Sequence, residues 1–185
     1  MKTIHPVLVF ILIFAAGLLT SCSKIKENLK ADFDYEAEAI TVTIPAIPVV
    51  GDGLEVTTAV AMDLDAIIQQ NAPLVSANNI RAINLTGITV ELADTDEGNN
   101  LQNLESIRVA VGADGVGEQV IAEIADNPDV YETSLSIPVT DGAVDLKPYI
   151  MKKKFDYTLH VKPRRGTTKS LTVTVKTFYT FVVGV

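Results

Sequence analysis

The sequence predicts an all-β fold, a single antiparallel β-sandwich of about eight strands with one or two short helices. Apolar and polar residues alternate with a period of two through most of the chain, which is typical of strands with one buried face. Turn sequences such as Gly51-Asp52-Gly53 and Pro163-Arg164-Arg165-Gly166 separate these runs, at intervals of about 8–15 residues. Short strands spaced in this way favour an antiparallel sandwich over βαβ units.

Two of the strand patterns contain a change of phase. Residues 33–44 switch phase near Ala39, and residues 80–93 switch at Gly87. A change of phase sends the apolar side chains to the other face of the sheet unless an extra residue intervenes. We therefore expect a β-bulge at Gly87, and a bulge or a crossing between sheets near Ala39. The remaining strands are expected at 54–64, 107–111, 120–124, 135–139, 155–161 and 171–183.

Residues 63–71 form the strongest helix pattern. Asp63 can cap the first turn, and Pro73 ends the helix. Its apolar face is expected to contain Leu64, Ile67 and Ile68. Residues 144–151 predict a second, shorter turn or helix.

The first 21 residues are interpreted as an export signal. Lys2 supplies a positive charge, residues 7–19 form an uninterrupted apolar run, and Leu19-Thr20-Ser21-Cys22 closes the segment. The run is shorter than the roughly 20 apolar residues that a membrane-spanning helix needs. A signal peptide over residues 1–21 is therefore expected.

The Leu19-Thr20-Ser21-Cys22 tetrapeptide resembles the lipobox of bacterial lipoproteins, and the resemblance covers residues 1–22. In that family the cysteine sulfur receives a diacylglyceryl group, the peptide is cut before the cysteine, and the new amine is acylated. The resemblance implies that Cys22, the only cysteine of the chain, is the lipidated residue. Two or more acyl chains anchor a protein stably. Residues 22–31 would then be a tether and residues 32–185 the β-sandwich domain.

The residues after Cys22 bear on location. In lipoproteins of the enteric type, Asp directly after the cysteine favours the inner membrane, whereas Ser23 stands here and implies the outer membrane. Surface display in Bacteroidetes-type lipoproteins goes with an acidic cluster, whereas residues 23–30 are basic on balance. The resemblance therefore implies an outer-membrane protein that faces the periplasm. The strand layout also resembles the immunoglobulin-like β-sandwich domains of Bacteroidetes-type lipoproteins, although no diagnostic motif carries this second resemblance.

Composition argues against several classes of function. The 15 Lys and Arg against 23 Asp and Glu give a net charge of −8, whereas nucleic-acid binding needs a basic surface. The absence of Trp weakens a carbohydrate-binding interpretation. His5 lies in the signal segment and His160 lies on the polar phase of a strand, so Ser-His or Cys-His catalysis and a histidine zinc site are not expected. We expect no enzyme.

Residues 94–100 contain the one pattern that predicts a ligand. Asp94, Asp96 and Asn100 have the spacing of oxygen ligands in a calcium loop, with Gly98 allowing a tight turn. Leu104 stands where the complete loop signature places a Glu. The simpler interpretation is a solvated loop between two strands.

The function predicted from these features is a membrane-anchored, non-catalytic lipoprotein of the cell envelope that acts as an accessory or interaction module. Its expected partners are the membrane, through the lipid on Cys22, and an envelope protein. Two alternatives remain open. One is a binding module for an apolar or lipid ligand, because the aliphatic-rich chain could leave space between its sheets. The other is a calcium-dependent adhesion or glycan module at residues 94–100.

Overall fold

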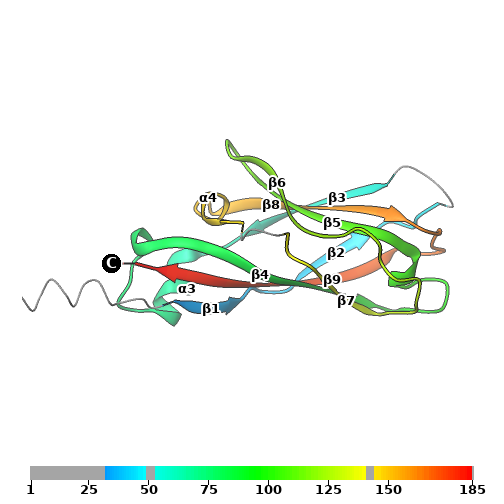
Figure 1. Ribbon diagram of the computed structural model, residues 1–185, viewed down its shortest axis with the longest axis horizontal. Helices are drawn as coiled ribbons and strands as arrows, with labels where there is room; N and C mark the ends of the chain where they lie inside the picture. Colours follow the sequence, from blue (N-terminus) through cyan, green and yellow to red (C-terminus); the bar gives the residue numbers. More distant parts are fainter. Residues whose placement is uncertain (1–31, 49–52, 141–143, 185) are drawn as a thin grey trace, which may run out of the picture.

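The computed structural model describes residues 32–48, 53–140 and 144–184, which form two antiparallel sheets packed face to face (Figure 1). Sheet A contains β1 (Phe33–Glu36), β2 (Ile40–Ile44), β4 (Ile80–Ala93), β7 (Ser134–Ile137) and β9 (Leu171–Val183). Sheet B contains β3 (Leu54–Ala61), β5 (Leu104–Ala113), β6 (Gly117–Ile124) and β8 (Lys154–Pro163). The helical segments are α3 (Leu64–Asn71) and α4 (Lys147–Ile150), with 3-10 turns η1 (Ala77–Asn79) and η2 (Leu101–Asn103). The predicted all-β sandwich is confirmed.

The strands follow the order of a jelly roll. Sheet A has the order β1-β9-β4-β7, with β2 also paired to β9, and sheet B has the order β3-β8-β5-β6. With β1 and β2 counted as one strand, every connection crosses to the other sheet except the β5–β6 hairpin, as in the eight-stranded double Greek key. Immunoglobulin domains place strands ABED in one sheet and CFG in the other. The strand order of this protein is therefore that of a jelly roll and not that of an immunoglobulin domain. Alternation predicts where strands lie but not which strands pair.

Both changes of phase are β-bulges. β1 and β2 pair with the same strand, β9, and the backbone N–H of Ala37 between them donates to the Thr177 carbonyl at 3.0 Å. This bulge divides the expected first strand in two, so the described residues form nine strands rather than about eight. In β4 the register against β9 shifts between Leu85 and Gly87. A Cβ on Gly87 would lie 3.4 Å from the ring of Phe178, which is an ordinary van der Waals distance.

The helix α3 forms as predicted. The Asp63 carboxylate accepts a hydrogen bond from the Ala66 backbone N–H at 3.1 Å and so caps the first turn. The side chains that share the apolar face, Leu64, Ile67 and Ile68, are buried. No helix within the described ranges is both long enough and apolar enough to cross a membrane.

Aliphatic and aromatic side chains fill the space between the sheets. The largest fully buried ones include Ile44, Ile83, Ile88, Ile107, Ile121, Phe155, Tyr179 and Phe181. A hollow of about 30 Å³ remains between the sheets, next to Val42, Val56 and Val109. This volume holds about one or two water molecules.

One polar contact crosses this core. The hydroxyl of Tyr157 on β8 and that of Tyr179 on β9 are joined by a hydrogen bond of 2.5 Å, which links sheet B to sheet A. Desolvation by burial raises the pKa of Tyr157 well above its usual value, and the neighbouring Tyr179 hydroxyl raises it further. The pair is therefore neutral and hydrogen-bonded at physiological pH.

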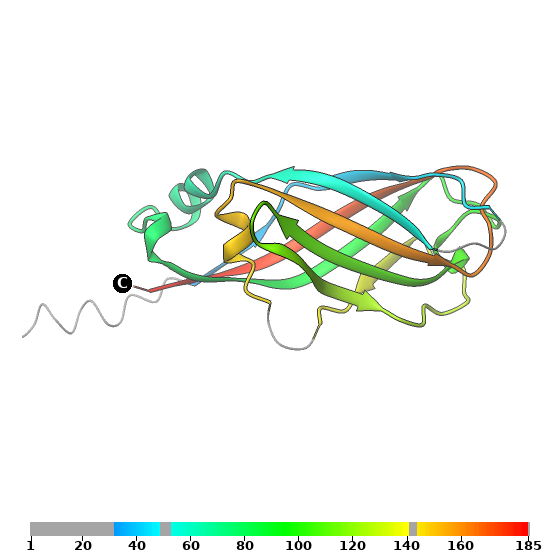
Figure 2. The same ribbon diagram turned by 90° about the horizontal axis from the view of Figure 1, so that it is seen from above.

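The long axis of the sandwich separates two ends (Figure 2). At the terminal end, Asp32 accepts a hydrogen bond from the Val183 backbone N–H, and α3, η1 and α4 lie nearby. At the loop end lie residues 94–103, 125–133 and 163–170, which connect strands of the two sheets. The described chain therefore begins and ends at the same end of the domain.

We expect Tyr157→Phe to lower the free energy of unfolding by about 1 kcal/mol, because one hydrogen bond is lost while the ring stays packed. The folded pKa of Tyr157 is raised above its unfolded value of about 10, so its contribution is present below about pH 10 and is lost as the pH rises through the folded pKa. Urea unfolding between neutral and alkaline pH measures both effects. Tyr131→Phe, at an exposed position, is the control. An unchanged alkaline loss of stability in Tyr157→Phe would contradict this assignment.

Candidate functional site

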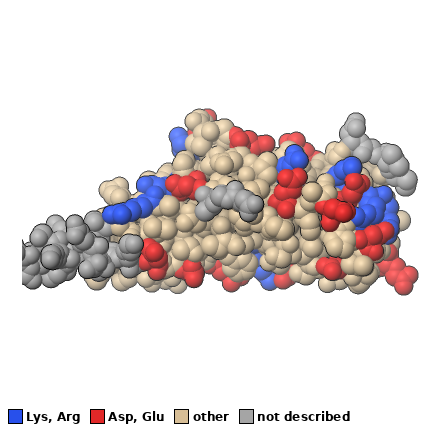
Figure 3. Space-filling view, in the orientation of Figure 1, with Lys and Arg blue, Asp and Glu red and all other residues tan. Residues whose placement is uncertain are grey.

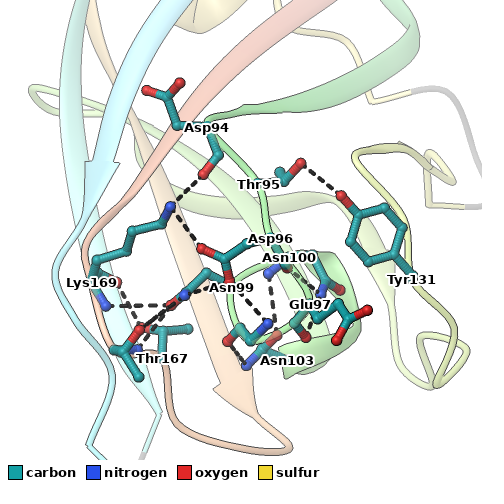
Figure 4. A network of polar contacts seen from close by, with 12 residues as sticks. Asp94, Thr95, Asp96, Glu97, Asn99, Asn100, Asn103, Tyr131, Thr167 and Lys169 are labelled. Carbon is teal, nitrogen blue, oxygen red and sulfur yellow. Dashed lines mark hydrogen bonds and ion pairs between the residues drawn. The ribbon is translucent and has the colours of Figure 1, made fainter.

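Three loops meet at the loop end and are joined by a network of hydrogen bonds (Figure 4). Residues 94–103 connect β4 to β5, residues 125–133 connect β6 to β7, and residues 163–170 connect β8 to β9. Each loop belongs to a different pair of strands, so the jelly-roll order is what brings them together.

The predicted ligands Asp94, Asp96 and Asn100 have three different environments. The Asp96 carboxylate accepts hydrogen bonds from the Gly98 backbone N–H at 2.9 Å and from the Asn99 amide at 2.8 Å. Asn100 is fully buried, and its side-chain oxygen accepts from a backbone N–H two residues later. Figure 4 shows the Asp94 carboxylate directed away from both. The three side chains therefore do not converge on one point.

Lys169, in the loop between β8 and β9, places a positive charge next to Asp94 and Asp96. Its ammonium lies 2.9 Å from the Asp96 carboxylate and donates to the Asp94 carbonyl oxygen at 2.6 Å. The hydrogen bond from Lys169 is the largest cause that lowers the pKa of Asp96, followed by the bond from Asn99. Within the described ranges, no three His, Cys, Asp or Glu side chains are grouped closely enough to hold a metal ion. Calcium binding stays a prediction, and in this geometry it would compete with Lys169.

The loops are held by four buried asparagines, which we call the asparagine clasp: Asn99, Asn100, Asn103 and Asn127. Each is at most 3% exposed. A buried amide offers two donors and an acceptor oxygen, so one side chain can join backbone groups of separate loops. The sequence predicts a solvated loop over 94–100, and this is wrong for Asn99 and Asn100, which are buried where the three loops meet.

Asn99 and Asn103 connect the first loop to the third. The Asn99 side-chain oxygen accepts from the Thr168 backbone N–H at 2.8 Å. The Asn103 amide donates to the carbonyl oxygens of Gly98 at 3.0 Å and Gly166 at 2.8 Å. Each asparagine therefore fixes the third loop against the first.

Asn127 and Arg164 connect the second loop to the same cluster. The Asn127 amide donates to the carbonyl oxygens of Leu101 at 2.8 Å and Leu104 at 2.9 Å. The Arg164 guanidinium donates to the carbonyl oxygens of Asn127 and Gln102. The sequence indicates a turn at Pro163-Arg164-Arg165-Gly166. The side chain of Arg164 in this turn is only about one-fifth exposed, and it joins the first and second loops.

Around the clasp, three side chains form an exposed surface that we call the loop-end face: Val130, Tyr131 and Arg165. Val130 and Tyr131 are each 51% exposed. The Tyr131 hydroxyl is 2.9 Å from that of Thr95, and the Arg165 guanidinium donates to both carboxylate oxygens of Asp129. The face thus combines one aliphatic, one aromatic and one guanidinium group on loops that are fixed in place.

His160 lies away from this cluster on the outer surface of sheet B. Its Nδ1 is 3.5 Å from the Glu55 carboxylate and its Nε2 is 3.8 Å from that of Glu118. The imidazole lines an open hollow of about 340 Å³ that also includes Arg108 and Glu123. This arrangement places carboxylates beside the histidine, and Ser106 is among the other residues that line the hollow.

Cys22 and the rest of residues 1–31 lie outside the described residues, so lipidation stays a prediction. A scan against protein-family models and a search of curated proteins find no match to the chain.

The asparagine clasp is the feature that sequence reasoning misses. The pattern Asn99-Asn100-Leu101-Gln102-Asn103 is its one local signal, because Asn100 and Asn103 form a capping box around η2.

We expect Asn103→Ala to lower the free energy of unfolding by about 3 kcal/mol, because it removes two part-buried hydrogen bonds to carbonyls and leaves the buried Asn100 backbone N–H without its partner. Urea unfolding measures the change. Asn78→Ala, at an exposed position of η1, is the matched control and should change stability by less than about 0.5 kcal/mol. Equal effects of the two variants would show that the clasp does not hold the loops.

We expect the melting temperature of the wild type to stay constant up to millimolar calcium, because Lys169 already neutralises Asp96. A bound calcium ion would raise the melting temperature, because it would bind the folded state and not the unfolded state.

In Lys169→Met, carboxylate titration by NMR should show the pKa of Asp96 closer to its ordinary value, because the main cause of its lowering is gone. Lys162→Met, which removes a separate ion pair with Glu105, is the control. A calcium-dependent rise in the wild type would instead establish the metal site.

Proposed function

We propose that the protein is a lipid-anchored, non-catalytic interaction module of the bacterial cell envelope, held at the periplasmic side of the outer membrane, whose loop-end face binds a partner protein. The observation that carries the proposal is the loop-end face itself, three exposed side chains on loops that the asparagine clasp holds in one arrangement. The Cys22 lipobox resemblance supplies the anchor.

The composition and the rigidity of this face favour protein binding. Tyr and Arg are enriched among the residues that contribute most to protein–protein affinity. Tyr131 and Val130 are exposed on one of the fixed loops, and Arg165 is exposed on another, where it pairs with Asp129 next to Val130. Binding by loops that are already ordered avoids the entropic cost of fixing them. The buried hydrogen bonds of Asn99, Asn103 and Asn127 supply that order before any partner arrives.

The position of the face relative to the anchor supports the same function. The chain enters the domain at the terminal end, and β4, which has 14 residues, leads from there to the loop end. At about 3.3 Å per residue this strand spans about 45 Å. A tether over 22–31 reaches at most about 35 Å. An anchor on Cys22 would thus hold the terminal end near the bilayer and present the loop-end face to the periplasm.

The space between the sheets gives little support to the alternative of an apolar ligand. A site for a small molecule commonly has a volume of about 300–1,000 Å³. The hollow between Val42, Val56 and Val109 measures about 30 Å³, so a ligand there would have to separate the sheets.

Labelling of cells with radioactive or alkyne-tagged palmitate tests the anchor. We expect the wild type to carry the label and the Cys22→Ser variant to lose it, because the chain contains no other cysteine. An unlabelled wild type would remove the anchor from the proposal and leave the loop-end face to be tested alone.

Site-specific photocross-linking in intact cells tests the face. A photoreactive amino acid at position 131 should give one discrete adduct, and Arg165→Ala combined with Val130→Ser should abolish it because two of the three exposed side chains are then lost. A photoreactive amino acid at Thr41, exposed on the surface of β2, is the matched control. Equal adducts from positions 41 and 131, or no adduct from either, would contradict partner binding at the loop end.

A further inference from the structure

The basic residues of the described chain divide by position into two groups. Six of them form ion pairs with carboxylates, and these are Arg108, Lys162, Arg164, Arg165, Lys169 and Lys176. The other five, which we call the terminal-end cations, form no ion pair with any described carboxylate: Arg81, Lys147, Lys152, Lys153 and Lys154. All five belong to segments at the terminal end.

The fold gathers these cations around α3, η1 and α4. Lys147 begins α4, and residues 152–154 form the turn from α4 into β8. The Met62 backbone N–H donates to the Lys153 carbonyl at 3.3 Å, which holds this turn beside the start of α3. Arg81 follows η1, and its side chain lies against Gly184, which is the last described residue of the chain. Figure 3 shows basic and acidic side chains both near this end and at the loop end.

Two exposed apolar side chains accompany the cations. Leu74, in the connection between α3 and η1, is 96% exposed, and Met151, directly before the three lysines, is 43% exposed. Met151 also lines a half-open cleft of about 390 Å³, together with Met62, Leu64 and Ile150. Monomeric proteins commonly expose single apolar residues. Here the most exposed one, Leu74, shares an end with the five described cations that form no ion pair.

We propose that the terminal end docks on the surface of an anionic lipid bilayer, with the terminal-end cations at the headgroups and with Leu74 and Met151 in the interface. The cations match the charge of an anionic leaflet, and apolar side chains beside them enter the boundary between headgroups and acyl chains. Acidic side chains at the same end oppose this attraction, and they include Asp32, Asp34, Asp63, Asp65 and Asp145. The carboxylates of Asp32, Asp63 and Asp145 accept hydrogen bonds from backbone N–H groups. The orientation of the docked domain rests on the proposed anchor, which leaves from the same end.

Vesicle sedimentation of the mature chain from residue 22, carrying Cys22→Ser and therefore no lipid, tests the docking. We expect binding to vesicles of phosphatidylglycerol and phosphatidylethanolamine, little binding to phosphatidylcholine alone, and loss with added salt. A lysine near an anionic surface strengthens binding about fivefold, so Lys152→Gln with Lys154→Gln should weaken it about 25-fold. Thr41→Glu with Thr43→Glu changes the net charge equally on exposed positions of β2 and is the matched control.

A fluorescent probe reports which end makes contact. Because Cys22 is the only cysteine, Leu74→Cys or Thr43→Cys in the Cys22→Ser chain carries one environment-sensitive dye. We expect a blue shift on anionic vesicles for the dye at 74 and none for the dye at 43. Equal binding to both kinds of vesicle, wild-type binding by the lysine variant, or equal shifts from the two dyes would overturn the proposal. None of these results depends on palmitate labelling, so the docking and the anchor can fail separately.

Discussion

The architecture depends on β9, the last strand of the described chain, because it pairs with the first strands and with β4 at once. β1 and β2 lie along one edge of β9, while twelve residue pairs join its other edge to β4. Phe33 pairs with Phe181 across this ladder, so the sheet closes only when residues far apart in the sequence meet. Contacts between such distant residues fold slowly, since the loop-closure entropy is lost before the pairing compensates for it. The same pairing puts both termini of the described chain at one end and leaves the other end to the loops.

The bulges and the helix could be predicted from the sequence because each is a local matter. Gly87 sits between two alternating runs of opposite phase, and only an inserted residue can keep both runs buried. Asp63 and the spacing of Leu64, Ile67 and Ile68 specify α3 within a single segment. The jelly-roll order could not be read in this way. Whether β9 pairs with β4 or with another strand depends on the packing of the whole chain, and many orders share the same alternation.

The asparagine clasp shows why the site was harder to predict than the fold. Asn99 and Asn103 are polar residues in a Gly-containing segment, which is also the composition of a solvated loop. Their burial follows from the arrival of Gly166 and Thr168, more than 60 residues later, whose backbone groups complete their hydrogen bonds. The spacing of Asp94, Asp96 and Asn100 favours calcium when the segment is considered alone. In the folded protein the ammonium of Lys169, from the loop that contains Gly166 and Thr168, already lies against Asp96. Local ligand spacing therefore carries little weight until the neighbouring loops are known.

The net charge of −8 and the proposed docking on an anionic membrane are compatible because of where the charges lie. Screening confines electrostatic attraction to about 8 Å at physiological salt, so a docked surface responds to its own charges rather than to the sum over the molecule. At the terminal end Lys152, Lys153 and Lys154 have no described carboxylate partner, whereas at the loop end Asp96 and Asp129 compensate Lys169 and Arg165. The acidic excess elsewhere is repelled by the same leaflet. Attraction at one end and repulsion over the remainder would both turn the loop-end face away from the bilayer, which is the orientation that partner binding requires.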